Sequence, residues 1–166
     1  VKSGEEAVVL RFGKHNKTVS KAGLNWHLPA PIESVSKVNI MEVKRFEIGY
    51  KTLKEGSPYE YPVYGDVSAE ESLMLTGDEN LVHVEAAVQY KINNAVDYLF
   101  NVSNKDKTLK TAAESAIRRV VANHILDEVL TENRSEIQRE IKEDLQEICN
   151  QYRMGIYIVD VSLQDV

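Results

Sequence analysis

The sequence has no hydrophobic run long enough to cross a membrane as a helix. Within its 166 residues, no stretch approaches the roughly 18–20 consecutive apolar residues that such a helix needs. No signal peptide is recognisable, and the chain begins at Val1 rather than at an initiator methionine. We therefore expect this chain to be a fragment of a longer protein.

Cysteine is almost absent. The single Cys149 cannot form an internal disulfide, so the cysteine count leaves the redox compartment open. It lies on a predicted helix beside the apolar stripe, next to Glu147, Ile148 and Asn150, without the basic setting that activates a thiol. We interpret it as a small, partly buried hydrophobic residue.

The motifs of the common enzyme classes are also missing. The sequence contains no GxGxxG, P-loop, GxSxG or HExxH pattern. A net charge of −6, from 20 Lys+Arg against 26 Asp+Glu, argues against a nucleic-acid partner. We expect no catalytic residue, no cofactor and no metal site. The histidines lack the spacing of metal ligands: His15, His27, His83 and His124.

The first half of the chain predicts strands. Val35 to Ile48 is a long extended stretch, and its alternation slips between Ile40 and Met41, which suggests a β-bulge. Pro29 and Pro31 exclude a helix around them. Glycine and proline are dense in residues 50–70, which predicts a long loop that also holds Tyr59, Tyr61 and Tyr64.

A hairpin is predicted around residues 76–80. A short apolar strand ends in Thr76-Gly77-Asp78-Glu79-Asn80, whose glycine, aspartate and asparagine supply turn chemistry. The strand that follows alternates with period 2, which is typical of a half-buried antiparallel strand. Its apolar face consists of Val82, Val84, Ala86, Val88, Tyr90 and Ile92.

The second half predicts helices and a closing strand. Helices are expected over Asn94–Phe100, Asp106–His124 and Asn133 to about Arg153, the last with Asn133 and Glu136 in a capping box. The strand Ile156–Leu163 is apolar on both faces at its start, which favours a central, covered position. Strands followed by helices indicate an α+β fold, an antiparallel or mixed sheet with helices packed on one face.

Several segments together resemble the SPFH (band-7, prohibitin-homology) family, and within it the HflK branch. The resemblance covers nearly the whole chain, in the family's order. It implies two closely packed subdomains, residues 1–78 and 79–166, that meet near residues 75–80. The segments are EAVVLRFGK at 6–14, AGLNWHLP at 22–29, ESLMLTGDEN at 71–80, ILDEVLTENR at 125–134, and MGI with VDV between 154 and 161.

The resemblance also implies a role. Proteins of this branch are membrane-anchored scaffolds that assemble with an HflC-like paralogue around an FtsH-type membrane protease, so we expect a non-enzymatic regulator that oligomerises. It implies a single transmembrane anchor before Val1, a coiled-coil segment after Val166 and a periplasmic location at a bacterial inner membrane. The alternative is a lipid- or small-ligand-binding domain with an apolar groove between sheet and helices. A deep apolar cavity along the Asp106–His124 helix would favour that alternative.

Three sets of residues are candidates for contact with other molecules. Trp26 is either a core anchor or a membrane-interface residue, since tryptophan prefers the membrane–water boundary. Tyrosine combines a large ring with a hydroxyl and favours interfaces, whereas Asp78 and Glu79 are either turn chemistry or a partner contact. The sets are Leu24, Trp26, Leu28 and Pro29 for the membrane; Tyr59, Tyr61, Tyr64, Asp78 and Glu79 for a partner; and Arg139, Lys142 and Glu143 for lateral assembly.

Overall fold

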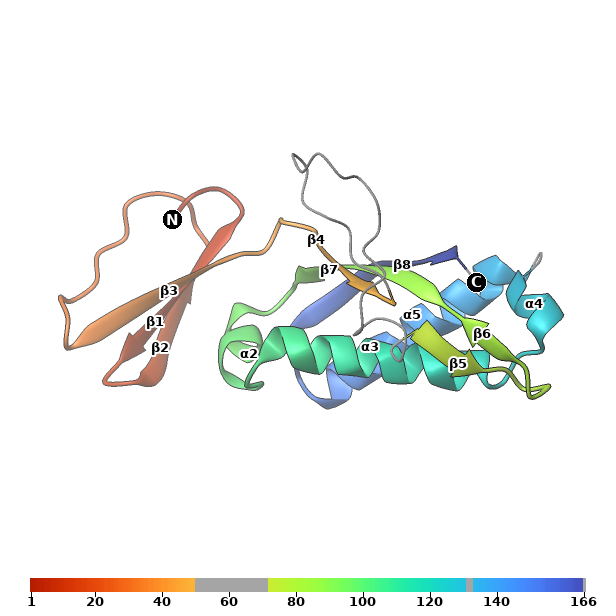
Figure 1. Ribbon diagram of the computed structural model, residues 1–166. Coiled ribbons are helices and arrows are strands. Elements are labelled where there is room, and N and C mark those ends of the chain that lie inside the picture. The colour runs from red at the N-terminus through yellow and green to blue at the C-terminus, as the bar shows by residue number, and fades with distance from the viewer. Residues whose placement is uncertain (50–71, 131–132, 166) are drawn as a thin grey trace, which may run out of the picture.

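The computed structural model describes residues 1–49, 72–130 and 133–165 (Figure 1). A small sheet at the N-terminal end stands beside a larger sheet that is covered by helices. Every strand pair in the described ranges is antiparallel, and the predicted α+β class is confirmed. Tyr59, Tyr61 and Tyr64 lie outside the described residues.

The N-terminal sheet has the strand order β2-β1-β3. Its strands are β1 (Glu5–Arg11), β2 (Lys14–Val19) and β3 (Glu33–Asn39), and residues 20–32 connect β2 to β3. The inner face packs through Val8 and Val38 against Ile92 and Ala95, which belong to the second half of the chain. A small separate core therefore joins this sheet to the rest of the molecule.

The second sheet has the order β4-β7-β8, from β4 (Lys44–Ile48), β7 (Glu85–Ile92) and β8 (Ile156–Asp165). The chain leaves β3 at Asn39 and enters β4 at Lys44, so the slip near Ile40 marks a change of sheet. The predicted β-bulge there is wrong. The predicted subdomain boundary near residue 78 stays a prediction.

The strand β8 lies at an edge of this sheet, since it pairs with β7 alone among the described strands. Its side chains alternate: Ile156, Ile158 and Val161 are buried, whereas Tyr157 is exposed. The predicted central position, covered on both faces, is wrong. Ile156 is buried and Tyr157 is exposed, so two adjacent apolar residues at the start of this strand do not mean two buried faces.

Helices cover one face of the second sheet, as predicted. They are α2 (Ala95–Phe100), α3 (Lys105–Val121), α4 (Leu126–Leu130) and α5 (Arg134–Gln151). Figure 1 shows α3 and α5 running side by side along the sheet. Their buried stripes join the sheet in one large core, which includes Leu109, Ala113, Ile117, Ile137, Ile141 and Leu145 with Ala86, Val88, Ile158 and Val161.

A side-chain cap is present at the start of α2, where none was predicted, and absent at the start of α5, where a capping box was predicted. Asn94 caps α2 through hydrogen bonds that its side chain accepts from the backbone N–H groups of Val96 and Asp97. Asn133 makes no such bond, and Glu136 instead accepts from Arg139. The capping box predicted for α5 is therefore wrong, although the helix begins where expected.

The predicted hairpin is confirmed, with β5 (Leu73–Leu75) paired to β6 (Leu81–His83). The long alternating strand is divided at Val84, so that β6 pairs with β5 and β7 pairs with β4 and β8. Val84 is buried like Val82 and Ala86, because the alternation of buried and exposed residues continues across the break. One periodic stretch thus serves two sheets.

Candidate functional site

The loop between β2 and β3 carries the membrane-interface candidates. Leu24 is 91% exposed, Trp26 is 86% exposed and Leu28 is 44% exposed. Pro29 is exposed as well. Trp26 is therefore no core anchor, and that alternative is wrong. Contact with a membrane stays a proposal.

A buried carboxylate fixes this loop to the sheet. Glu33, which is 3% exposed, accepts hydrogen bonds from the guanidinium of Arg11, from the amide of Asn16 and from the backbone N–H of Leu28, the last at 2.8 Å. The Leu28 N–H, followed by Arg11, holds the pKa of Glu33 below its usual range. The loop is thus anchored at its C-terminal end by a charged group that the sequence pattern did not single out.

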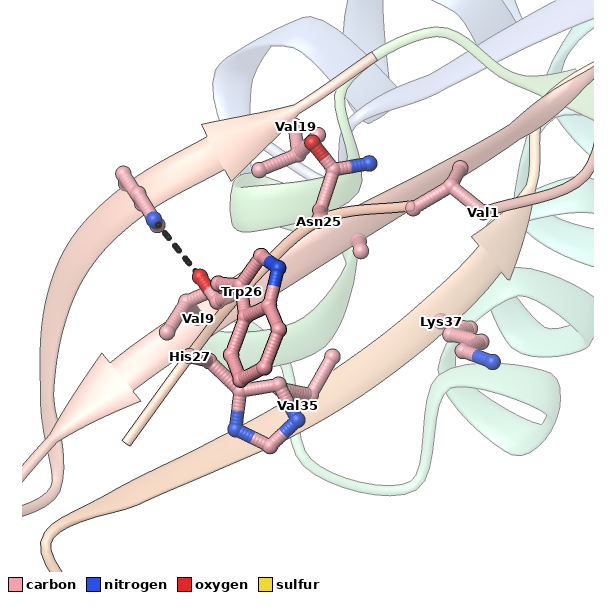
Figure 2. Close-up of a pocket in the computed structure, with 10 residues that line it drawn as sticks. Val1, Val9, Val19, Asn25, Trp26, His27, Val35 and Lys37 are labelled. Atoms are coloured by element: carbon pink, nitrogen blue, oxygen red, sulfur yellow. Dashed lines mark hydrogen bonds between the residues drawn. The ribbon is translucent and has the colours of Figure 1, made fainter. Parts of the chain in front are cut away.

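The loop covers a cavity on the outer face of the N-terminal sheet (Figure 2). Its volume is about 160 Å³. Valine side chains form its floor, and Trp26 and His27 lie over it. The Lys17 ammonium donates to the Trp26 carbonyl at 3.4 Å and ties β2 to the loop.

The hairpin turn holds the partner-contact candidates Asp78 and Glu79. The Asp78 carboxylate accepts from the Thr76 hydroxyl at 2.6 Å and from the backbone N–H of Leu126 at 3.1 Å. The Thr76 hydroxyl and the Leu126 N–H lower the pKa of Asp78. Asp78 therefore docks the turn on the start of α4, whereas Glu79 is exposed.

His124 completes the corner where α3, α4 and the turn meet. Its backbone carbonyl accepts from Gly77 at 2.8 Å, and a Cβ on Gly77 would lie 3.0 Å from the Ala122 carbonyl oxygen. The ring nitrogens contact Glu140 at 2.9 Å and Glu128 at 3.0 Å. These carboxylates, Glu140 first, raise the pKa of His124. No spacing along the sequence predicts this cluster, because Glu140 lies on another helix.

The lateral-assembly candidates lie on one flank of α5. Arg139 pairs with Glu136 and, at 3.0 Å, with Glu143. Lys142 instead donates to the Val159 carbonyl at 2.7 Å and fastens α5 to β8. Arg139 and Glu143 thus present the exposed charges of this flank, and Lys142 supports the fold.

A further exposed surface lies on the strands of the hairpin β5–β6, outside the predicted contact residues of its turn. Met74 and Val82 are buried, while the opposite face exposes Leu73, Leu75 and Leu81 at 40%, 49% and 69%. The alternation of this short segment is the sequence signal that could have identified it. An apolar face of this kind suits contact with another protein.

Two observations bear on chemistry. Across residues 1–49, 72–130 and 133–165, no three His, Cys, Asp or Glu side chains gather in a way that would hold a metal ion. Cys149 is 1% exposed, and burial raises the pKa of its thiol to about 11. The cysteine is therefore a core residue, in agreement with its predicted structural role.

The helix α3 borders a groove of about 920 Å³ beside β4. Phe46, Tyr90 and Leu109 contribute apolar surface, and Asp106 and Lys107 are among its charged residues. Below the groove the stripe of α3 is packed into the sheet, with Ala113 and Ile117 fully buried. The groove is thus an open surface feature with charged walls, unlike a deep apolar cavity.

The fold and these surfaces define a domain that offers contact faces. A family comparison matches the SPFH domain / Band 7 family over residues 1–166, and the chain belongs to that family. Within the described ranges, no helix is long and apolar enough to span a bilayer.

Among its relatives, the chain is 35% identical over 164 residues to the "Modulator of FtsH protease HflK" of Escherichia coli K12. It is 37% identical over 164 residues to a "Protein HflK" of Buchnera aphidicola subsp. Schizaphis graminum. These alignments cover 99% of the chain and 33% and 34% of the relatives. The chain therefore spans about a third of the length of these curated relatives.

Proposed function

We propose that this chain is a non-enzymatic scaffold domain that regulates or compartmentalises an FtsH-type membrane protease. The observation that carries the proposal is the similarity to HflK proteins, which extends over 99% of the chain. The E. coli relative is named a modulator of FtsH protease. Because the match spans a third of that relative, the role of the whole protein is inferred here from one domain.

The proposed partners are copies of this chain, an HflC-like paralogue and the protease itself, in a ring or cage. We place the domain beside the membrane, on the periplasmic side of a bacterial inner membrane, held by an anchor outside this sequence. The filled core under α3 and the charged walls of its groove support an assembly domain over the alternative of a ligand-binding domain.

Two surfaces are proposed for lateral contact between like subunits. One is the α5 flank with Arg139 and Glu143, and the other is the outer face of the hairpin β5–β6. Exposed ion pairs contribute about 0–1 kcal/mol each. Three leucines cover much less than the roughly 800 Å² that each partner buries in a stable interface. We therefore expect weak contacts that become effective only when anchoring raises the local concentration.

Sedimentation of this chain and of the full-length membrane protein tests the proposal. At micromolar concentration the chain is expected to sediment as a monomer or weak oligomer, while the anchored protein forms large assemblies that co-purify with an FtsH-type protease. The double variant Arg139→Glu and Leu75→Asp should reduce the large assemblies. Lys107→Gln, on α3, is the control. A full-length protein that neither assembles nor binds the protease would refute the proposal.

A further inference from the structure

The strand β8 has a long edge that no described strand covers. It pairs with β7 alone among the described strands, and with 10 residues it is the longest of them. An edge of this kind presents a row of backbone N–H and C=O groups, which is a template for pairing with a strand of another molecule. Stable proteins protect such edges with charged side chains, bulges, short strands or a cover from another element.

Other edge strands of this protein are protected by their own side chains. The strand β2 carries Lys14 and Lys17, and Lys44, Arg45 and Glu47 supply charges to β4. In β8, by contrast, residues 156–163 read IYIVDVSL and contain a single charged residue. High β-propensity with low charge is typical of segments that pair between molecules. The strand β8 therefore needs a cover from elsewhere in the chain.

Gln146 on α5 supplies the first part of this cover. Its carboxamide accepts a hydrogen bond from the backbone N–H of Ile158 at 2.8 Å and donates one to the carbonyl of Ile156 at 3.1 Å. Residues two apart on a strand direct their backbone groups to the same edge. The side-chain amide thus makes the pair of hydrogen bonds that a peptide group of a neighbouring strand would make.

Two further side chains of α5 continue along the same edge. The Lys142 ammonium donates to the carbonyl of Val159 at 2.7 Å, and the Arg134 guanidinium donates to the carbonyl of Leu163 at 2.6 Å. Because these carbonyls bond to α5 rather than to β7, they mark the edge of β8 that faces away from the sheet. We call Gln146, Lys142 and Arg134 the edge cover.

We propose that the edge cover is an autoinhibitory contact, which closes β8 to antiparallel pairing with the β8 strand of a second copy of this chain. Antiparallel pairing of two identical edges is two-fold symmetric, so the contact satisfies both copies at once and forms a closed dimer. Such a dimer would join two sheets β4-β7-β8 into one continuous sheet through main-chain hydrogen bonds. The edge cover keeps the sheet of each copy separate.

The edge cover has its largest consequence where copies of the domain are crowded. In the proposed scaffold, anchoring brings neighbouring domains to a roughly millimolar effective concentration. At that concentration an open β8 edge would join neighbours through their sheets instead of through the surfaces proposed for lateral contact. This consequence rests on the proposed function, whereas the autoinhibitory contact belongs to the single domain and is tested in dilute solution.

Sedimentation of the double variant Lys142→Ala with Gln146→Ala tests the proposal. Alanine is the best helix former, so the change removes hydrogen bonds from the edge and still favours α5. The variant should dimerise at least about tenfold more tightly than the wild type, since several backbone hydrogen bonds form in the pairing. The variant also loses a positive charge from an acidic chain, so electrostatic repulsion opposes its association.

Hydrogen exchange at the backbone N–H of Ile158 identifies the mode of association. In the monomeric variant this N–H should exchange faster than in the wild type, because Gln146 no longer accepts from it. At concentrations at which the variant dimerises, pairing of the edges should protect it again. The matched control is Arg139→Ala with Glu143→Ala, which has the same spacing on α5 and leaves the net charge unchanged. It should stay monomeric, with wild-type exchange at Ile158.

Each of the other outcomes overturns the proposal. They are a double variant that stays monomeric up to millimolar concentration, association without protection of Ile158, and equal association of the control. Gln146→Ala alone keeps Lys142 and Arg134 in place and replaces the double variant if that variant does not fold. If neither variant folds, the edge cover is required for folding and the proposal is refuted. The scaffold role is decided separately, by co-purification of the anchored protein with the protease.

Discussion

The two sheets of this protein cover their hydrophobic faces by different means. The sheet β4-β7-β8 is covered by the apolar stripes of α3 and α5 in one large core. The sheet β2-β1-β3 has a core of Val8, Val38, Ile92 and Ala95 on one face and a polar-anchored loop on the other. Local stability follows buried apolar area, so the sheet β2-β1-β3 should open at lower free energy than the sheet β4-β7-β8. The helix-covered sheet is thus the more stable region, and the N-terminal sheet depends on polar contacts to hold the loop on its outer face.

The largest expected effect removes a side chain from the helix-covered core. Leu145 is fully buried, and Leu145→Ala should lower the free energy of unfolding by about 2–5 kcal/mol. Chemical denaturation measures it. Leu75→Ala is the control, because this leucine is exposed and its removal should cost less than about 0.5 kcal/mol. Equal losses of unfolding free energy in the two variants would show that Leu145 does not belong to a core that stabilises the fold.

A smaller effect concerns the corner held by His124. His124→Gln should cost about 1 kcal/mol at low pH, because the ring lies between Glu128 and Glu140 near the surface. The folded-state pKa of His124 is raised, so its contribution is complete below about pH 6.5 and is lost as the pH rises through the folded pKa. Stability measured against pH should therefore converge for variant and wild type at high pH. His15→Gln, in the N-terminal sheet, is the control.

The next change is confined to the N-terminal sheet. Glu33→Gln should loosen the loop without unfolding the helix-covered sheet, since the contacts of Glu33 to Arg11 and Leu28 lie within the N-terminal sheet and its loop. The pKa of Glu33 is lowered, so its stabilisation is present above about pH 4.5 and is lost as the pH falls through the folded pKa. Hydrogen exchange at Leu28 reports it, with Glu79→Gln, an exposed carboxylate of the hairpin turn, as the control. Faster exchange in α3 as well would show that the two regions unfold together.

The smallest expected effect is that of Trp26→Ala. Because the ring is 86% exposed, the free energy of unfolding should change by no more than about 0.5 kcal/mol, as for other surface substitutions. Thermal unfolding measures it. A loss of several kcal/mol would mean that the loop contributes to the core of the sheet β2-β1-β3. The difference in stability proposed between the two sheets would then be wrong.

The parts of the fold set by periodicity were predictable. The alternation from Val82 to Ile92 and the stripes of α3 and α5 reflect burial on one side, which a sequence displays directly. Periodicity does not show which strand a given strand pairs with. The chain switches sheets between Asn39 and Lys44 and again at Val84, and the alternation continues or slips without revealing which strand is opposite.

The candidate surfaces were predictable only in part: residue types and turn chemistry are visible in the sequence, whereas contacts between distant residues are not. An aromatic residue in a proline-rich loop drew attention to Trp26, but only packing decides between core and solvent. Asp78 fitted turn chemistry, and its bond to Leu126 depends on a contact across 48 residues. The clusters around Glu33 and His124 combine residues from different elements, so no spacing along the chain predicts them.

The strand β7 belongs to both regions, since Val88 lies in the large core and Ile92 in the small one. Its eight residues form a rigid rod about 25 Å long, at about 3.3 Å per residue. Most of the strand, with Ala86, Val88 and Tyr90, lies in the large core, and its last residue, Ile92, lies in the small one. A tilt of the N-terminal sheet would therefore be transmitted through Ile92 to the helix-covered sheet.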